Sequence, residues 1–128
     1  MKEKADLVRG WLAKARSDLL AMEASLKAGA YDAACFHAQQ CVEKYFKALL
    51  QENSIPFGKT HHLISLLELI IAVEPSMEMF RPQLQSLNTY SVSIRYPGES
   101  ADRVIAREAL GIAKTLRTQF RQKLSLNP

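Results

Sequence analysis

The segment from Tyr31 to Asn53 limits the possible folds more than any other part of the chain, because its apolar residues repeat at helical spacing on more than one face. At 1.5 Å per residue this helix would be roughly 35 Å long. A helix that is apolar on several sides must be contacted by neighbours on each of them. The apolar residues form two stripes, Ala34, Ala38, Cys41, Tyr45 and Ala48 in the first and Cys35, Val42, Phe46 and Leu49 in the second.

The remaining side of this helix mixes apolar and charged residues. Phe36 and Leu50 lie there, with Glu43 and Lys47 between them. Large apolar side chains on an outer face favour a covered surface over one that meets water. We therefore expect a second copy of the chain to cover Phe36, Glu43, Lys47 and Leu50, which would make the protein a homodimer.

Helical periodicity continues on both sides of this segment, and no strand pattern competes with it. Short connections make sequential helices antiparallel neighbours. The sequence thus predicts one all-α domain over residues 1–128, an up-and-down four-helix bundle with an additional short or terminal helix. The other helices are expected at residues 3–27, from a cap at Thr60 to about Glu74, at 82–97 and at 100–124, whereas residues 76–81 are ambiguous.

The composition is that of an ordinary globular protein, with 48% hydrophobic and 23% charged residues. No apolar run approaches the ~20 residues that would span a bilayer, and the N-terminus has no secretory signal. We expect a cytoplasmic protein without a membrane role. The net charge of +4 permits an acidic partner such as RNA or a nucleotide without requiring one.

Two cysteines, Cys35 and Cys41, lie on the same predicted helix. Their spacing puts the Cα atoms roughly 10 Å apart, beyond the ~7 Å that a disulfide can bridge. We interpret both thiols as small buried apolar groups.

Gly58-Lys59-Thr60 resembles the end of a phosphate-binding P-loop, but Asn53 occupies the position of the first glycine and a helix precedes it. A P-loop is therefore excluded. The exposed amides at the start of the third helix, with Lys59 and His61 nearby, form a candidate anion site. A helix start that is simply capped is the alternative.

The histidines do not have the spacing of a metal site. His61 and His62 would point about 100° apart on a helix, and neither has a ligand partner four residues away, so we expect no metal and no cofactor. His37, beside Lys44, is interpreted as a hydrogen-bonded interior histidine. Asp18 lies at the margin of the first helix's core stripe and should have a cationic partner.

The last helix predicts an apolar face and a basic face. Ile105, Ala109, Ile112, Leu116 and Phe120 would point inward. A basic stripe is most often a solvated surface, yet cations aligned along one side also suit contacts to a phosphate chain. The basic residues are Arg103, Arg107, Lys114, Arg117 and Arg121.

Four sequence blocks together resemble the HEPN family (higher eukaryotes and prokaryotes nucleotide-binding domain). The first two are Trp11-x3-Ala15-x2-Asp18-Leu19 and a pattern of residues from Tyr31 to Leu50 that includes Gln39-Gln40 and Glu43-Lys44. The third, Thr60-His61-His62-Leu63, is similar to the Thr-His-Asp-Leu that opens the family's third helix, and Arg95-Tyr96-Pro97 matches the close of its fourth.

The resemblance implies a helical bundle that forms homodimers and is encoded beside a minimal nucleotidyltransferase, often as a toxin and antitoxin pair. Many members are metal-independent ribonucleases that use an arginine followed four to six residues later by a histidine. This chain has no histidine beyond His62, so Arg95 alone carries over, as a phosphate binder.

We therefore expect a nucleotide- or RNA-binding module that acts with a nucleotidyltransferase partner. One alternative is a degenerate ribonuclease in which His61, His37 or Tyr96 replaces the missing histidine. Another is a dimerisation scaffold without a ligand. The candidate nucleotide- or phosphate-binding residues are Arg95, Tyr96, His61, Lys59, Lys44 and Asp18.

Overall fold

The computed structural model describes residues 3–93 and 97–126, and all the regular elements in these ranges are helical. The predicted all-α bundle with an additional short helix is confirmed. In the described part of the chain, no helix combines the length and the apolar character that crossing a bilayer requires. The elements are α1 (Lys4–Lys27), α2 (Tyr31–Glu52), α3 (Leu63–Ile70), the 3-10 helix η1 (Pro75–Phe80), α4 (Arg81–Ser93) and α5 (Arg103–Lys123).

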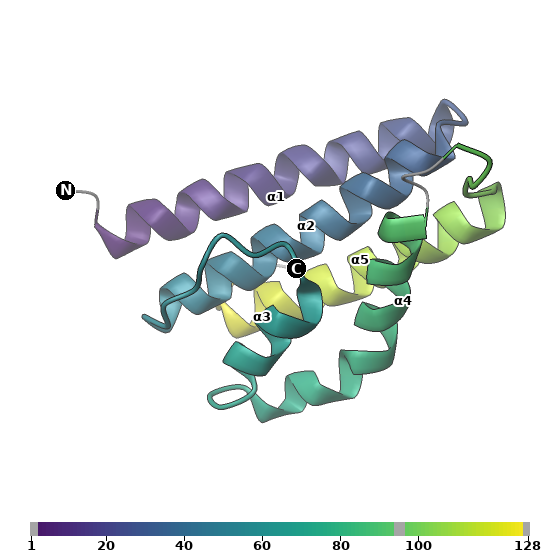
Figure 1. Cartoon of the computed structure of the whole chain (residues 1–128). Helices are drawn as coiled ribbons and strands as arrows, with labels where there is room; N and C mark the ends of the chain where they lie inside the picture. The colour runs from purple at the N-terminus through teal and green to yellow at the C-terminus, as the bar shows by residue number, and fades with distance from the viewer. Residues whose placement is uncertain (1–2, 94–96, 127–128) are drawn as a thin grey trace.

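The two longest helices, α1 and α2, form an antiparallel hairpin (Figure 1). The chain reverses at Gly29, whose φ of +80° lies in the left-handed region that glycine adopts without strain. Ala15 and Met22 of α1 are fully buried, and the Cys41 thiol donates a hydrogen bond to the Ala15 carbonyl at 3.4 Å. Helix α1 thus packs along most of the length of α2.

Both thiols of α2 are buried and free, as predicted. Desolvation raises the pKa of Cys41 to about 12 and that of Cys35 to about 11. Each thiol therefore stays protonated at neutral pH and acts as a packing group.

The core lies around α2, which α5 and the α3 to α4 region cover on its other sides (Figure 1). Phe120 of α5 is fully buried against two aromatic rings of α2. Its ring stacks on Tyr45 with 5.7 Å between centroids and meets Phe46 edge to face at 4.8 Å. These contacts fix the C-terminal helix on the central one, as the apolar excess of α2 required.

The third helix is shorter than expected at both ends. Its N-cap is His62 and not Thr60, because the His62 Nδ1 accepts a hydrogen bond from the Ser65 amide at 3.4 Å. The helix ends at Ile70, so Val73 is 49% exposed instead of buried. Pro75 then opens η1, and proline disfavours a helical conformation in the residue before it.

The buried face of α5 is rotated from the expected one. Ile105 and Ile112 lie only at the margin of the core, whereas Leu110 is buried. Alanines on this face, which let α5 approach its neighbours closely, take the place of the predicted isoleucines. The buried residues are Ala106, Ala109, Leu110, Ala113, Leu116 and Phe120.

Candidate functional site

Glu43 lies fully buried in the middle of α2 among cationic and imidazole groups. Its Oε2 accepts hydrogen bonds from Lys44 Nζ at 3.0 Å and Lys47 Nζ at 3.3 Å, and its Oε1 lies 2.8 Å from His61 Nδ1. Burial alone would raise the pKa of Glu43, but the hydrogen bonds from Lys44 and His61, with the lysine charges, hold that pKa below its usual value. We name Glu43, Lys44, Lys47 and His61 the Glu43 cluster.

The position of this cluster corrects the expected homodimer surface. Glu43, Lys47 and Leu50 are buried within a single chain, so a second copy does not cover them. Of the four residues expected there, Phe36 alone is exposed, with 47% of its surface accessible. The mixed side of α2 is covered, but by a neighbouring helix and the loop between α2 and α3.

Lys47 shows how this cover is built. Its ammonium lies 5.3 Å from the ring centre of Trp11 on α1 and 6.0 Å from that of Phe57 in the loop. The two rings also meet edge to face at 5.9 Å. A cation over aromatic faces is stabilised without a second carboxylate, which explains how a lysine can be buried here.

A chain of side-chain hydrogen bonds on α2 positions His61. Gln39 Nε2 donates to the His61 carbonyl at 2.8 Å, and Gln40 Nε2 donates to Gln39 Oε1 at 2.8 Å. Lys44 Nζ closes the chain by donating to Gln40 Oε1 at 2.8 Å. The His61 backbone and Nδ1 are thereby both held, while its side chain is 71% exposed.

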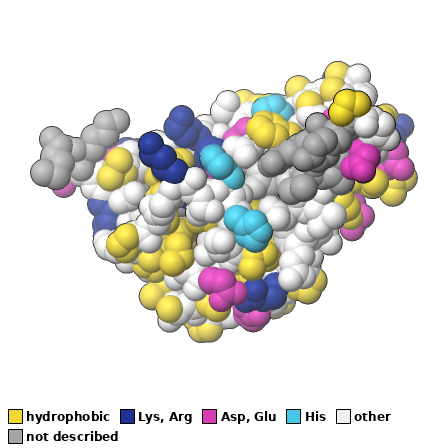
Figure 2. Space-filling view, in the orientation of Figure 1, with side chains coloured by type: hydrophobic (Ala, Val, Ile, Leu, Met, Phe, Trp, Pro, Cys, Tyr) yellow, Lys and Arg dark blue, Asp and Glu magenta, His cyan; other side chains and the backbone are white. Residues whose placement is uncertain are grey.

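The exposed side of His61 faces an open groove of about 670 Å³ between α2, the loop and α4. Figure 2 shows histidine side chains spread over this face of the molecule. An exposed aromatic ring, three side-chain amides and several other hydrogen-bonding groups border the groove. We name it the His61 groove, and its lining residues are Phe36, Gln39, Gln40, Lys59, Thr60, His61, His62, Asn88 and Ser91.

The predicted site residues separate into three groups. Lys59 and His61 meet in the His61 groove, and Lys44 supports it from the Glu43 cluster. Asp18 lies apart from the groove, where its Oδ1 is 2.9 Å from the Nδ1 of His37. The contact gives His37 a hydrogen-bond partner, as expected, and pairs Asp18 with an imidazole, whereas a cation was expected. Arg95 and Tyr96 lie outside the described residues.

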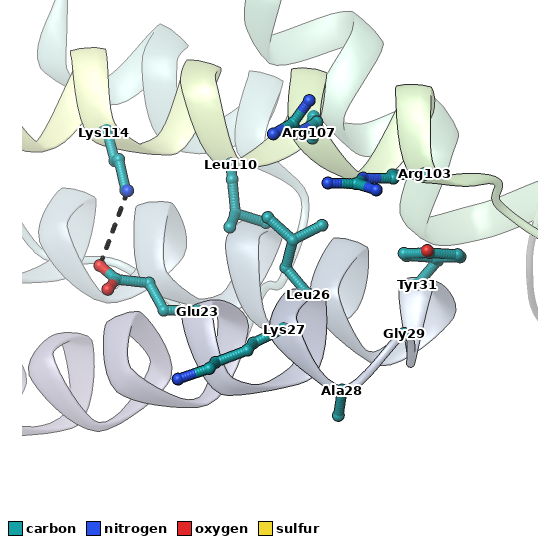
Figure 3. Close-up of a pocket in the computed structure, with 10 residues that line it drawn as sticks. All are labelled: Glu23, Leu26, Lys27, Ala28, Gly29, Tyr31, Arg103, Arg107, Leu110 and Lys114. Atoms are coloured by element: carbon teal, nitrogen blue, oxygen red, sulfur yellow. Dashed lines mark ion pairs between the residues drawn. The ribbon is translucent and has the colours of Figure 1, made fainter.

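The basic stripe of α5 is less uniform than expected. Arg103 and Arg107 line a second groove, of about 540 Å³, between α5 and the turn that joins α1 to α2 (Figure 3). Lys114 lines it too but forms an ion pair with Glu23 of α1 at 3.8 Å. The Nε of Arg117 is buried and has no hydrogen-bond partner among the described residues, so this side chain is not fully part of the exposed stripe.

Most of the residues that line the His61 groove were not identified as binding residues from the sequence. Gln39 precedes Glu43 by four residues, so helical spacing placed both on one side of α2 and was the available signal. Asn88 and Ser91 of α4 gave no such signal, because their nearness to α2 arises only from the fold. Among the described residues, no group of three or more His, Cys, Asp or Glu side chains is arranged to hold a metal.

The α1–α2 hairpin, the short α3 and the loop held to α2 by the Glu43 cluster define an all-α bundle with a groove beside its central helix. The sequence profile of the HEPN domain matches residues 8–123. The chain therefore belongs to the HEPN domain family, as its sequence blocks indicated.

Two relatives extend this assignment. The chain is 32% identical over 95 residues to a protein of Methanocaldococcus jannaschii named "Putative toxin MJ1304", and the match covers 68% of this chain. It spans 61% of the length of that relative. The crystal structure of TT1696 from Thermus thermophilus superimposes with a TM-score of 0.80 at 30% identity, covering 91% of this chain and 97% of that one.

Proposed function

We propose that this HEPN domain binds RNA or a nucleotide through phosphate groups in the His61 groove. The observation that carries the proposal is that Lys59, His61 and His62 together line one open groove. An ammonium and imidazole groups are suitable donors to phosphate oxygens.

Arg95 and Tyr96 belong to this proposal through their position in the sequence. Arg95 follows Ser91, which lines the groove, by four positions in the sequence. An arginine fork binds phosphate through two parallel hydrogen bonds. We propose Arg95 as the main phosphate ligand, with Tyr96 beside it.

The experiment compares RNA binding by two groove variants and a matched control. Lys59→Gln and Arg95→Gln should each weaken binding of a labelled single-stranded RNA about tenfold, since a hydrogen bond to a charged group contributes roughly 1.5 to 3 kcal/mol. Each should also lower the slope of log affinity against log salt by about 0.7, because one phosphate contact is lost. Fluorescence anisotropy measures both quantities.

Lys14→Gln is the control for that experiment, since Lys14 is an exposed lysine of α1 that does not line the His61 groove. It should change the affinity and the salt slope little. Equal losses in Lys14→Gln and Lys59→Gln would mean that RNA is attracted by net charge alone, and the groove would be rejected as the site.

Ribonuclease activity is a second candidate function, and the contact between Glu43 and His61 favours it. A carboxylate can only accept a hydrogen bond, so the Nδ1 of His61 donates to Glu43, and the Nε2 is the ring nitrogen left to act as a base. An oriented imidazole at a phosphate groove is suited to take a proton from a ribose hydroxyl. If wild-type protein leaves the RNA of the binding experiment intact at pH 6 to 9, this function is excluded.

The match to "Putative toxin MJ1304" supports a toxin-like role for this chain, together with an antitoxin that binds it. We propose a minimal nucleotidyltransferase, encoded by a neighbouring gene, as that partner. Co-expression with the neighbouring gene product followed by size-exclusion chromatography tests the pairing. Separate elution of the two proteins would contradict it.

The homodimer remains part of the proposal, with Phe36 as the residue of the expected surface that is free to contribute. Phe36→Glu should convert a dimer to a monomer, because a charge would replace a buried ring at the interface. Light scattering measures the mass. The control is Leu20→Glu, because Leu20 is also an exposed apolar residue but lies on α1 instead of α2. A Phe36→Glu variant that keeps the dimer mass would remove Phe36 from the interface.

A further inference from the structure

The groove between α5 and the turn from α1 to α2 has the composition of a binding site of its own (Figure 3). Arg103 and Arg107 form its basic wall, and the half-buried ring of Tyr31 lies across from Arg103. Leu26 and Leu110 supply apolar surface between them. We name this site the Arg103 groove, after the first residue of α5.

The two arginines of this groove lie close together on α5. They are one helical turn apart on the same face of α5, so both side chains can reach a single ligand. Neither has an ion pair or a hydrogen bond within the described part of the chain. Two adjacent guanidinium groups repel each other, and a bound anion would relieve that repulsion while accepting their hydrogen bonds.

The charges at the far end favour a compact anion over a nucleic-acid strand. Lys114 is already paired with Glu23, whose carboxylate remains 49% exposed. A polyanion that followed the groove from Arg103 toward Lys114 would meet this carboxylate. The volume of about 540 Å³ lies within the roughly 300 to 1,000 Å³ typical of small-molecule sites.

We propose that the Arg103 groove binds a nucleoside phosphate. The phosphates would contact Arg103 and Arg107, and the base would pack against the ring of Tyr31 and the side chain of Leu26. The anionic phosphates would thus meet the basic wall of the groove, and the base would meet its apolar surface. The proposal does not depend on the His61 groove, because the two grooves share no lining residue.

Isothermal titration calorimetry of the full chain with ATP, pyrophosphate and single-stranded RNA tests the proposal. Arg103→Gln and Arg107→Gln should each weaken ATP binding about tenfold, the effect of losing a charge-assisted hydrogen bond. Arg103→Lys keeps the charge but loses the fork, so its loss should be smaller. Tyr31→Leu should weaken ATP and leave pyrophosphate unchanged.

A matched control separates this site from the net charge of the protein. Arg16→Gln, an exposed arginine of α1 outside the groove, should leave ATP binding unchanged. Circular dichroism establishes that each variant is folded. Failure of RNA binding in Lys59→Gln would bear only on the His61 groove.

Three results would overturn the proposal. The first is no ATP binding by the wild-type chain. The second is pyrophosphate binding as tight as that of ATP with no effect of Tyr31→Leu, which would leave no role for the nucleoside. The third is a loss of RNA affinity in Arg103→Gln with ATP affinity unchanged, which would assign the groove to a nucleic-acid strand.

Discussion

Replacing Glu43 with alanine is expected to lower the free energy of unfolding by about 3 to 5 kcal/mol, the usual cost of removing one partner from a buried ion pair. Lys47 is 5% exposed and would stay buried without its carboxylate. His61 would also lose the hydrogen bond that anchors the loop over α2. Urea denaturation, read by far-UV circular dichroism, measures the loss.

Glu52→Ala is the matched control, since Glu52 is an exposed glutamate near the end of the same helix and should cost at most about 0.5 kcal/mol. The double variant Glu43→Leu with Lys47→Met should recover part of the loss, because it leaves no unpaired charge in the core. A loss below about 1 kcal/mol in Glu43→Ala would mean that water reaches the cluster and screens it.

The same carboxylate gives the wild type a defined pH dependence. The pKa of Glu43 is lower in the folded chain than the value near 4.3 of an unfolded one. Its stabilising contribution is therefore fully present above about pH 4.3 and is lost as the pH falls through the lower, folded-state pKa. Stability should fall with acid more steeply in the wild type than in the double variant.

Phe120→Ala is expected to lower the free energy of unfolding by about 3 to 5 kcal/mol, as for other buried aromatic residues. The ring is fully buried and contacts both Tyr45 and Phe46, so its removal leaves a cavity between α5 and α2. Phe120→Leu keeps most of the volume and should cost less. The same urea denaturation measures both variants.

Phe36→Ala is the control for Phe120→Ala, because it removes an equal volume from an exposed position. Its effect should be within about 0.5 kcal/mol when measured on the monomer. A similarly small effect of Phe120→Ala would show that α5 can dissociate from the core without unfolding it.

The sequence predicted the elements whose signals are local. The hairpin followed from helical periodicity and Gly29, and the observed bounds of α1 and α2 differ from the expected ones by about one residue, the usual uncertainty of helix ends. The end of α3 was missed because Val73 fits the periodicity while Pro75 changes the backbone before it. The position of the buried face of α5 was missed because alanine carries little hydrophobic signal, although its small side chain lets helices approach closely.

The His61 groove was also predicted only where its residues carry a local signal in the sequence. Lys59 and His61 lie at a helix start, which is a local signal, and both line the groove. The role of Glu43 depends on a contact between residues 18 positions apart in the chain. The mixed apolar and charged side of α2 led us to expect cover by a second copy, whereas α1 and a loop of the same chain cover it. Periodicity cannot distinguish these two kinds of cover.

The loop that covers Lys47 also places a natural optical probe beneath it. Trp11 is the single tryptophan of the chain, and its indole contacts both Phe57 of the loop and the ammonium of Lys47. Any event that lifts the loop from α2, whether a ligand in the His61 groove or a change at Glu43, would solvate this indole. Tryptophan emission therefore reports the position of the loop directly, with no label added to the protein.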